Sequence, residues 1–149
     1  MYKLILFLLV AFMLLISCGS NDETIDIKEE IKTSLITNSD LIYEIKDFID
    51  VGWKKNKKLD NTEFQSTEGI WYGFFNRRDA EIWIYDTHSN AVKYGAKYAE
   101  EAINKRPTNR DPTNPTSIRY HAYLITGNAM ILCEDNLEDC VEILNTMQK

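Results

Sequence analysis

The chain has few of the residues from which catalytic and metal sites are usually built. Its 149 residues include only two histidines and three cysteines. None of the motifs CxxC, HExxH and GxSxG occurs, and neither does a phosphate-binding glycine loop. The sequence therefore gives no support for a zinc protease, a serine hydrolase or a nucleotide-binding enzyme. We expect neither a catalytic residue nor a cofactor.

Positive charge is also in short supply. Seventeen basic residues stand against twenty-three acidic ones, which gives a formal net charge of −6. Nonspecific nucleic-acid binding depends on Lys and Arg contacts to phosphate, so nucleic acid is not an expected partner. Proline is equally scarce: all three prolines fall between Pro107 and Pro115, in a polar segment that predicts an extended loop.

Only one long apolar run occurs, the thirteen residues from Leu4 to Ile16. As a helix this run would span roughly 20 Å, which is short of the roughly 30 Å hydrocarbon core of a bilayer. A positive residue, Lys3, precedes it and polar residues follow it. The pattern is typical of the apolar region of an export signal.

The end of this run, Leu15-Ile16-Ser17-Cys18, resembles the bacterial lipobox. The resemblance implies cleavage between Ser17 and Cys18, diacylglycerol on the Cys18 sulfur and acylation (palmitate or a similar chain) of the new amino terminus. An ordinary secretory signal with a chance cysteine is the alternative. Because two or more acyl chains hold a protein stably on a membrane, we expect a lipoprotein of the cell envelope. It would sit on the outer membrane or on the outer face of the inner membrane.

We therefore predict a signal peptide at residues 1–17, a lipidated tether at 18–26 and one domain at 27–149. The leader carries only Lys3, so the mature chain has 16 basic and 23 acidic residues and a net charge of −7. Two cysteines remain, Cys133 and Cys140. In an oxidising compartment we expect them to form a disulfide; two buried thiols, or a metal or redox pair, are the alternatives.

Hydrophobic periodicity predicts alternating helices and strands. Helices are expected around the stripe Ile27, Ile31 and Leu35, from Ser39 to Gly52, from about Thr87 to Lys105, and from Asp135 or Asn136 onward. The lysine-rich run 53–58 is read as a solvated loop or the guard of a sheet edge, with an anion or headgroup site as the functional alternative. Strands are expected at 70–75, 81–85, 118–125 and 129–133.

A strand–turn–strand–helix unit therefore occurs twice, at 69–105 and 118–147. We predict an α+β fold in which a mainly antiparallel sheet of four or five strands carries helices chiefly on one face. This layout resembles a family of small uncharacterised bacterial lipoproteins. The resemblance lies in Asp40–Gly52, in AEIWIYDTHSNAVKYGAKYAEEA (80–102) and in YLITGNAMILCEDNLEDCVEIL (123–144). It implies an envelope protein of unknown role and brings no catalytic residues.

Aromatic side chains are the most prominent remaining feature of the predicted strands. If one sheet face is open, it would bind an apolar or planar ligand, a peptide or a sugar; the alternative is that these residues are core. The candidate ligand-binding residues are Trp71, Tyr72, Trp83, Tyr85, Tyr120 and Tyr123.

Metal binding has only weak candidates, Asp86, His88 and His121, because no dense ligand cluster accompanies them. The favoured function is a non-enzymatic envelope module that binds a small ligand or an envelope protein. The alternatives are a small metal-dependent or hydrolytic enzyme and an accessory solute-capture lipoprotein.

Overall fold

The computed structural model describes residues 32–37, 40–104 and 120–148. The chain divides into two units, residues 1–30 and 31–149, and all the described residues belong to the second. The predicted signal peptide, the predicted lipidation site Cys18, the predicted tether, the predicted helical positions Ile27 and Ile31 and the proline segment lie outside the described residues. Among the helices of the described part, none has the length and apolar character needed to cross a membrane.

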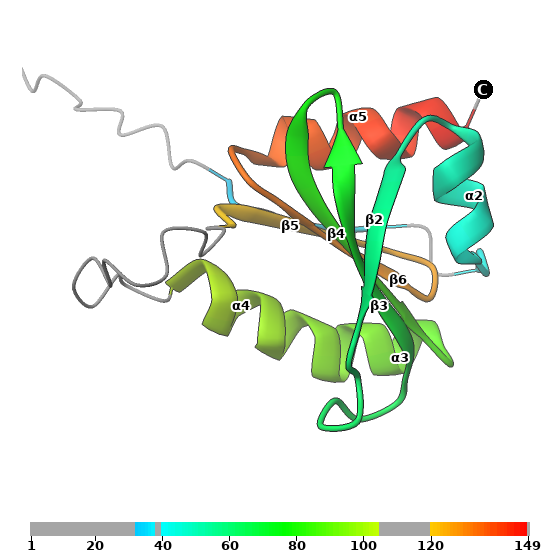
Figure 1. Ribbon diagram of the computed structural model, residues 1–149. Helices are drawn as coiled ribbons and strands as arrows, with labels where there is room; N and C mark the ends of the chain where they lie inside the picture. Colours follow the sequence, from blue (N-terminus) through cyan, green and yellow to red (C-terminus); the bar gives the residue numbers. More distant parts are fainter. Residues whose placement is uncertain (1–31, 38–39, 105–119, 149) are drawn as a thin grey trace, which may run out of the picture. The chain divides into compact units, whose positions relative to one another are not determined.

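The described unit is built on a six-stranded sheet in the order β1-β5-β6-β4-β3-β2 (Figure 1). β1 runs parallel to β5, and every other neighbouring pair is antiparallel. The prediction of an α+β fold with a mainly antiparallel sheet is thus confirmed in outline, whereas the predicted count of four or five strands is too low. The strands are β1 (Ser34–Thr37), β2 (Lys54–Leu59), β3 (Thr67–Phe75), β4 (Arg78–Tyr85), β5 (Ala122–Thr126) and β6 (Ala129–Cys133).

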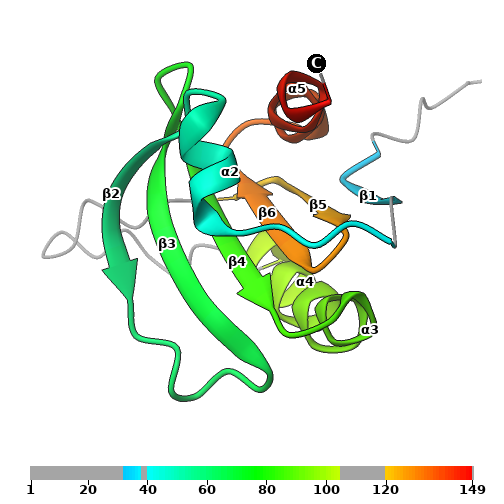
Figure 2. The same cartoon turned by 90° about the vertical axis from the view of Figure 1, so that its right-hand side faces the viewer.

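Helices cover both faces of the sheet, which corrects the prediction that they lie chiefly on one (Figure 2). The helices α2 (Ile45–Asp50) and α5 (Leu137–Met147) pack on one face, here called the α5 face. A continuous helical segment packs on the opposite face, here called the α4 face. It consists of α3 (His88–Asn90), the π-helical turn η1 (Ala91–Gly95) and α4 (Ala96–Asn104). Strand β4 shows why both are needed: Ile82 and Ile84 belong to the core under α5, while Trp83 and Tyr85 belong to the core under α4.

The N-terminal part of the described chain departs most from the prediction. Leu35, expected on a helix, lies in strand β1, where it pairs with Leu124. The helix expected from Ser39 begins only at Ile45, with Glu44 as its N-cap. The backbone of Tyr43 is instead held by Asn128, whose Oδ1 accepts from the Tyr43 amide at 2.6 Å. In both places a partner about 85 positions away in sequence overrides the local helical pattern.

The two hairpins and the last helix agree with the prediction. Asn76 and Arg77 have φ values of 49° and 70° and form the two-residue turn between β3 and β4. The side chain of Asn136 accepts a hydrogen bond from the Asp139 amide and so caps α5. The lysine-rich run was predicted to be either a solvated loop or the guard of a sheet edge. Its lysines lie on β2, which is an edge strand, in agreement with the second of these.

Cys133 and Cys140 form the expected disulfide, with an S–S distance of 2.09 Å. The bond joins the end of β6 to the first turns of α5, and both residues are buried in the core of the α5 face. It therefore fastens the last helix to the centre of the sheet.

Candidate functional site

The α4 face changes character from one end to the other. Side chains of neighbouring strands form rows across this face, because every second residue of a strand points to it. The first row is apolar and consists of Leu59, Ile70, Trp83, Met130 and Ile125. The next two rows contain polar and aromatic residues of β2, β3 and β4, namely Lys57, Tyr72 and Glu81, then Lys54, Phe74 and Asp79. These six residues are called the polar rows below.

Glu81 is the central carboxylate of the polar rows. Its Oε1 accepts from the indole nitrogen of Trp83 at 2.7 Å, and its Oε2 accepts from the Tyr120 hydroxyl at 2.9 Å. Burial raises the pKa of Glu81 above its ordinary value, while these two donors and the charge of Lys57 act in the opposite direction. Both carboxylate oxygens are therefore fixed in direction by aromatic donors of the core.

Asp79 is the second carboxylate, two residues before Glu81 on the same strand. Its Oδ1 accepts from the Tyr72 hydroxyl at 2.7 Å. Burial, and after it the hydrogen bond to Asp79, raises the pKa of Tyr72 to about 12, so this phenol stays protonated at neutral pH. The ring of Tyr72 meets the ring of Phe74 edge-on at 5.1 Å, and both residues are half-buried.

The two cations of the polar rows lie on the edge strand β2. Lys54 and Lys57 are exposed and lie opposite Phe74 and Tyr72. Lys54 and Phe74 also line an open hollow of about 640 Å³ together with Gly52, Asn76 and Arg77. The polar rows thus offer carboxylates, lysines and aromatic edges within one surface.

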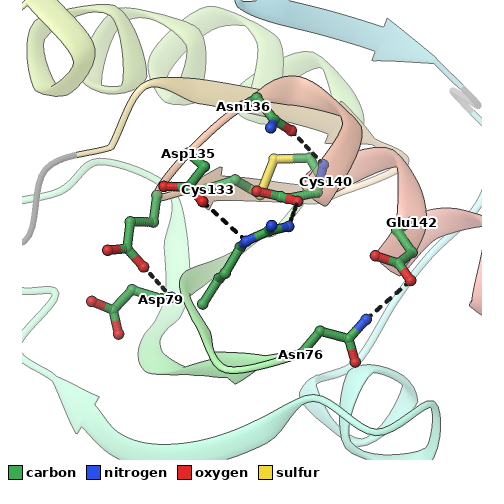
Figure 3. A network of polar contacts seen from close by, with 10 residues as sticks. Asn76, Asp79, Cys133, Asp135, Asn136, Cys140 and Glu142 are labelled. Carbon is green, nitrogen blue, oxygen red and sulfur yellow. Dashed lines mark hydrogen bonds and ion pairs between the residues drawn. A yellow bond between two sulfur atoms is a disulfide. The ribbon is translucent and has the colours of Figure 1, made fainter.

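A network on the neighbouring turn holds this end of the hairpin in place (Figure 3). Arg78 pairs with Asp135 at 3.0 Å and with Asp139, both at the start of α5. Asn76 donates to Glu142 at 3.0 Å, and the Asp79 amide donates to a carboxylate oxygen of Glu134 at 2.9 Å. The contacts join the β3–β4 turn to α5 and position the backbone of Asp79.

The apolar row of the α4 face is closed off by a cluster of aromatic rings. Phe64 meets Trp83 edge-on at 4.7 Å and Tyr98 edge-on at 5.0 Å. Tyr85 is fully buried below η1, where an added Cβ on Gly95 would come within 3.1 Å of its hydroxyl. Residues with larger side chains at position 95 would have to displace that ring.

The six aromatic candidates from the sequence do not form one open surface. Tyr72, Trp83, Tyr85, Tyr120 and Tyr123 share the α4 face, but four of these are buried and only Tyr72 is half-buried. Trp71 lies on the opposite face, where the Lys58 ammonium sits 5.5 Å from its ring centroid. Of the six, Tyr72, Trp83 and Tyr120 come together around the two carboxylates.

The weak metal candidates do not converge. The Nδ1 of His88 lies 2.7 Å from the carbonyl oxygen of Gly127, just before β6 begins. The Nδ1 of His121 bonds to the carbonyl oxygen of Glu134, just after β6 ends. The histidines therefore sit at opposite ends of one strand, and Asp86 accepts from Asn90. Residues 32–37, 40–104 and 120–148 contain no group of three or more His, Cys, Asp or Glu able to hold a metal.

Sequence reasoning missed Asp79 and Glu81 as site residues, and it considered Lys57 only as part of an alternative anion or headgroup site in the run 53–58. A signal was present: along β4, Asp79, Glu81, Trp83 and Tyr85 alternate with Ala80, Ile82 and Ile84. Two carboxylates in phase with two large aromatic residues indicate acids on a half-covered face. Their donors, however, include Tyr120, which is 39 positions away and could not be paired with Glu81 from the pattern alone.

Residues 44–109 match a family model described as a family of unknown function, DUF6810. This segment, less than half of the chain, contributes all six residues of the polar rows. No curated protein and no solved structure matches the chain. Residues 44–109 are thus similar to an uncharacterised domain family.

Proposed function

We propose that the protein is a lipid-anchored envelope protein that binds a small polar ligand or an envelope partner through its polar rows. In this proposal residues 1–17 are removed, Cys18 carries the lipid, 18–26 form the tether and 27–149 the binding domain. The lipobox-like sequence at residues 15–18 supports the anchor. The polar rows support the binding role.

The observation that carries the binding role is the arrangement around Glu81 and Asp79. The two carboxylates are oriented by Trp83, Tyr120 and Tyr72. A buried carboxylate costs free energy unless hydrogen bonds compensate it, so a sheet needs no such group for stability alone. Binding sites commonly combine such groups: hydrogen-bond acceptors held in a fixed direction, the edges of aromatic rings and, here, the exposed ammonium groups of lysines.

The ligand class follows from the same groups. Carboxylate oxygens accept from hydroxyl or amino groups, and the lysines at the border donate to oxygen atoms. The rings of Tyr72 and Phe74 provide apolar contact between these polar groups. A sugar, or another polyhydroxylated molecule with one apolar face, presents this combination.

A hydrolytic role is the second candidate, because one observation favours it. Asp79 and Glu81 lie two residues apart on one strand face, about 7 Å between Cα atoms. Most glycoside hydrolases use a pair of Asp or Glu side chains as acid and as base or nucleophile, and these two residues are such a pair. Burial also raises the pKa of Glu81, as an acid catalyst needs. The two candidates differ in one measurable property: a hydrolase turns its oligosaccharide over, and a binding module leaves it intact.

The binding test uses the full chain in detergent and a panel of neutral and amino-sugar oligosaccharides, followed by calorimetry and by chromatography of the sugars. We expect Tyr72→Ala and Lys57→Ala each to weaken binding about tenfold, which corresponds to about 1.4 kcal/mol. Trp71→Ala is the matched control, since Trp71 is also half-buried and on β3 but faces the other side. Equal losses in Tyr72→Ala and Trp71→Ala would count against the polar rows as the site.

The anchor is tested separately by growing cells with an alkyne-labelled fatty acid and measuring the mass of the isolated chain. We expect label on the wild type, a mature N-terminus at Cys18 and no label on Cys18→Ser. An unlabelled wild-type chain that keeps Met1 would refute the anchor and leave the ligand test unaffected.

A further inference from the structure

Three apolar side chains stand exposed at one corner of the sheet. Ile36 on β1 is 47% exposed, and Leu41 and Ile42, which follow β1, are 44% and 82% exposed. An aliphatic side chain as open as Ile42 loses the free energy that burial would provide. Ile36, Leu41 and Ile42 are called the apolar corner below.

The apolar corner is brought together by contacts with the β5–β6 hairpin. Ile36 is in register with Ile125, two residues before the turn. The carbonyl oxygen of Leu41 lies so close to Gly127 that a Cβ there would come within 2.0 Å of it. The three side chains therefore belong to the same end of the sheet.

The backbone next to Ile42 is rigidly held. The Tyr43 amide donates to Asn128 Oδ1, and Asn128 Nδ2 donates to the Tyr43 carbonyl at 3.2 Å and to the Tyr85 carbonyl at 3.0 Å. Asn128 itself is buried. Exposure of Ile42 is therefore imposed by fixed neighbours rather than by a loose terminus.

The lysines lie at the other edge of the same sheet. β2 carries Lys54, Lys55, Lys57 and Lys58, and five strand spacings separate it from β1. At about 4.8 Å per spacing, the two edges are roughly 24 Å apart. One edge is thus apolar and the other cationic.

We infer that the apolar corner docks into the interface of the bilayer to which the lipid anchors the chain. This inference rests on the proposed acylation of Cys18. Lys32, where the described chain begins, follows Cys18 by 14 residues, so it is at most about 48 Å of extended chain from the lipid. Ile36 lies on β1, the first strand of the described residues, and Leu41 and Ile42 follow that strand. An exposed apolar group held beside a bilayer gains by leaving water.

Docking at this corner turns the β2 edge away from the membrane. The polar rows are built from β2, β3 and β4, the half of the sheet remote from β1. A ligand site placed in that way is open to the surrounding solution. Anchoring and recognition then use opposite halves of one sheet.

The test places a fluorophore on the full, acylated chain in vesicles of phosphatidylethanolamine and phosphatidylglycerol. Cys18 carries lipid in this chain and Cys133 is joined to Cys140, so Ile42→Cys supplies one free thiol for an environment-sensitive label. Substitution at so exposed a position leaves the core intact. We expect a blue-shifted emission that lipids with spin labels on their acyl chains quench at least twofold.

Lys55→Cys, on the β2 edge, is the control and should show neither the shift nor the quenching. Equal emission and quenching at positions 42 and 55, in a chain that floats with vesicles, would overturn the docking and leave the anchor standing. A shift at position 42 without lipid quenching would also overturn it, because protein–protein contact then covers the corner. A chain that does not float would overturn both docking and anchor.

Discussion

The two faces of the sheet are covered to the same extent near its centre but with different kinds of residues. Under α5 the sheet presents small and aliphatic residues such as Ala122, Leu124 and Ile131, and a disulfide closes the layer. Under α4 it presents Trp83, Tyr85 and Tyr123 and then passes into carboxylates and lysines. The α5 face is closed under α5 and α2 and leaves Trp71 half-buried beside Lys58, whereas the α4 face opens at one end into the polar rows.

On the proposed function, this difference separates stability from recognition. Aliphatic residues pack densely and carry no polar atom that needs a partner. The aromatic residues of the α4 face bring hydrogen-bond donors, and those of Trp83 and Tyr120 bond to the two carboxylate oxygens of Glu81. We expect substitutions on the α5 face to change the free energy of unfolding and to leave binding unchanged. Substitutions in the polar rows should change binding, and at Glu81, which accepts from Trp83 and Tyr120, they should lower the free energy of unfolding as well.

The largest effect is expected at Trp53, which is 1% exposed and donates from its indole nitrogen to the Ala80 carbonyl at 3.1 Å. Trp53→Ala should lower the free energy of unfolding by about 4 kcal/mol, through lost burial and a residual cavity. Urea denaturation followed by circular dichroism measures it. Trp71→Ala, on the same face but half-buried, should cost less than half as much; equal costs would contradict the picture of a closed α5 face.

The next largest effect on stability is expected at Glu81, the central carboxylate of the α4 face. Glu81→Ala removes the acceptor of Trp83 and of Tyr120 and should lower the free energy of unfolding by about 3 kcal/mol. Glu81→Gln keeps an amide oxygen and should recover most of that loss. A smaller loss for Ala than for Gln would show that these hydrogen bonds do not stabilise the face.

Comparison of the wild type with Glu81→Gln also tests the direction in which the free energy of unfolding changes with pH. Burial raises the folded-state pKa of Glu81 above its ordinary value of 4.5. Below pH 4.5 Glu81 is protonated in both the folded and the unfolded protein, so its burial does not lower the free energy of unfolding. As the pH rises through the folded-state pKa, the free energy of unfolding falls. The wild type should therefore lose stability relative to Glu81→Gln with rising pH, in denaturation curves measured on both sides of that value.

The disulfide should have an intermediate effect confined to the α5 face. Cys133 and Cys140 are seven residues apart, and closing a loop of that size stabilises by about 2.5 kcal/mol in the chain-entropy model. Replacing both by Ala should reduce the unfolding free energy accordingly and leave oligosaccharide binding unchanged. A binding loss in the folded double variant would mean that the two faces are coupled.

The smallest effect is expected at Arg78, which pairs with Asp135 and Asp139 but is itself 47% exposed in its side chain. Exposed ion pairs contribute little, so Arg78→Gln should lower the unfolding free energy by less than about 1 kcal/mol. The loss should shrink further in high salt. A loss as large as that of Trp53→Ala would show that the turn, rather than the core, fastens α5.

Local features of the sequence were sufficient for the parts of the fold that local interactions determine. The turn that begins at Asn76, the cap of α5 and the two hairpins depend on residues near one another. A hairpin turn was expected over residues 76–79 and a cap at Asp135 or Asn136; the structure has them at Asn76–Arg77 and Asn136. The Cys133–Cys140 disulfide joins two adjacent elements and was expected for the same reason.

Long-range pairing accounts for what could not be predicted. Strand β1 exists because β5 offers it an edge, and α2 is short because Asn128 holds Tyr43 in a non-helical conformation. The apolar pattern of β4 shows that both its faces are covered, but it does not say which helix covers which. Of the residues in and around the polar rows, Tyr72, Trp83 and Tyr120 were among the sequence candidates. Phe74 and Glu81 were not, and pairing Glu81 with its donors required knowledge of the neighbouring segments.

If the proposed anchor holds several copies of the protein on one membrane, the four lysines of β2 affect how those copies meet. An edge strand leaves amide and carbonyl groups free to pair with the same strand of a neighbour, and confinement to a plane raises the frequency of such encounters. Like charges along both edges repel, so two molecules meeting through β2 would separate instead of extending a shared sheet. Acetylating those amines would remove the repulsion. The uncharged edge strand could then pair with the edge strands of neighbouring copies, and the protein would aggregate.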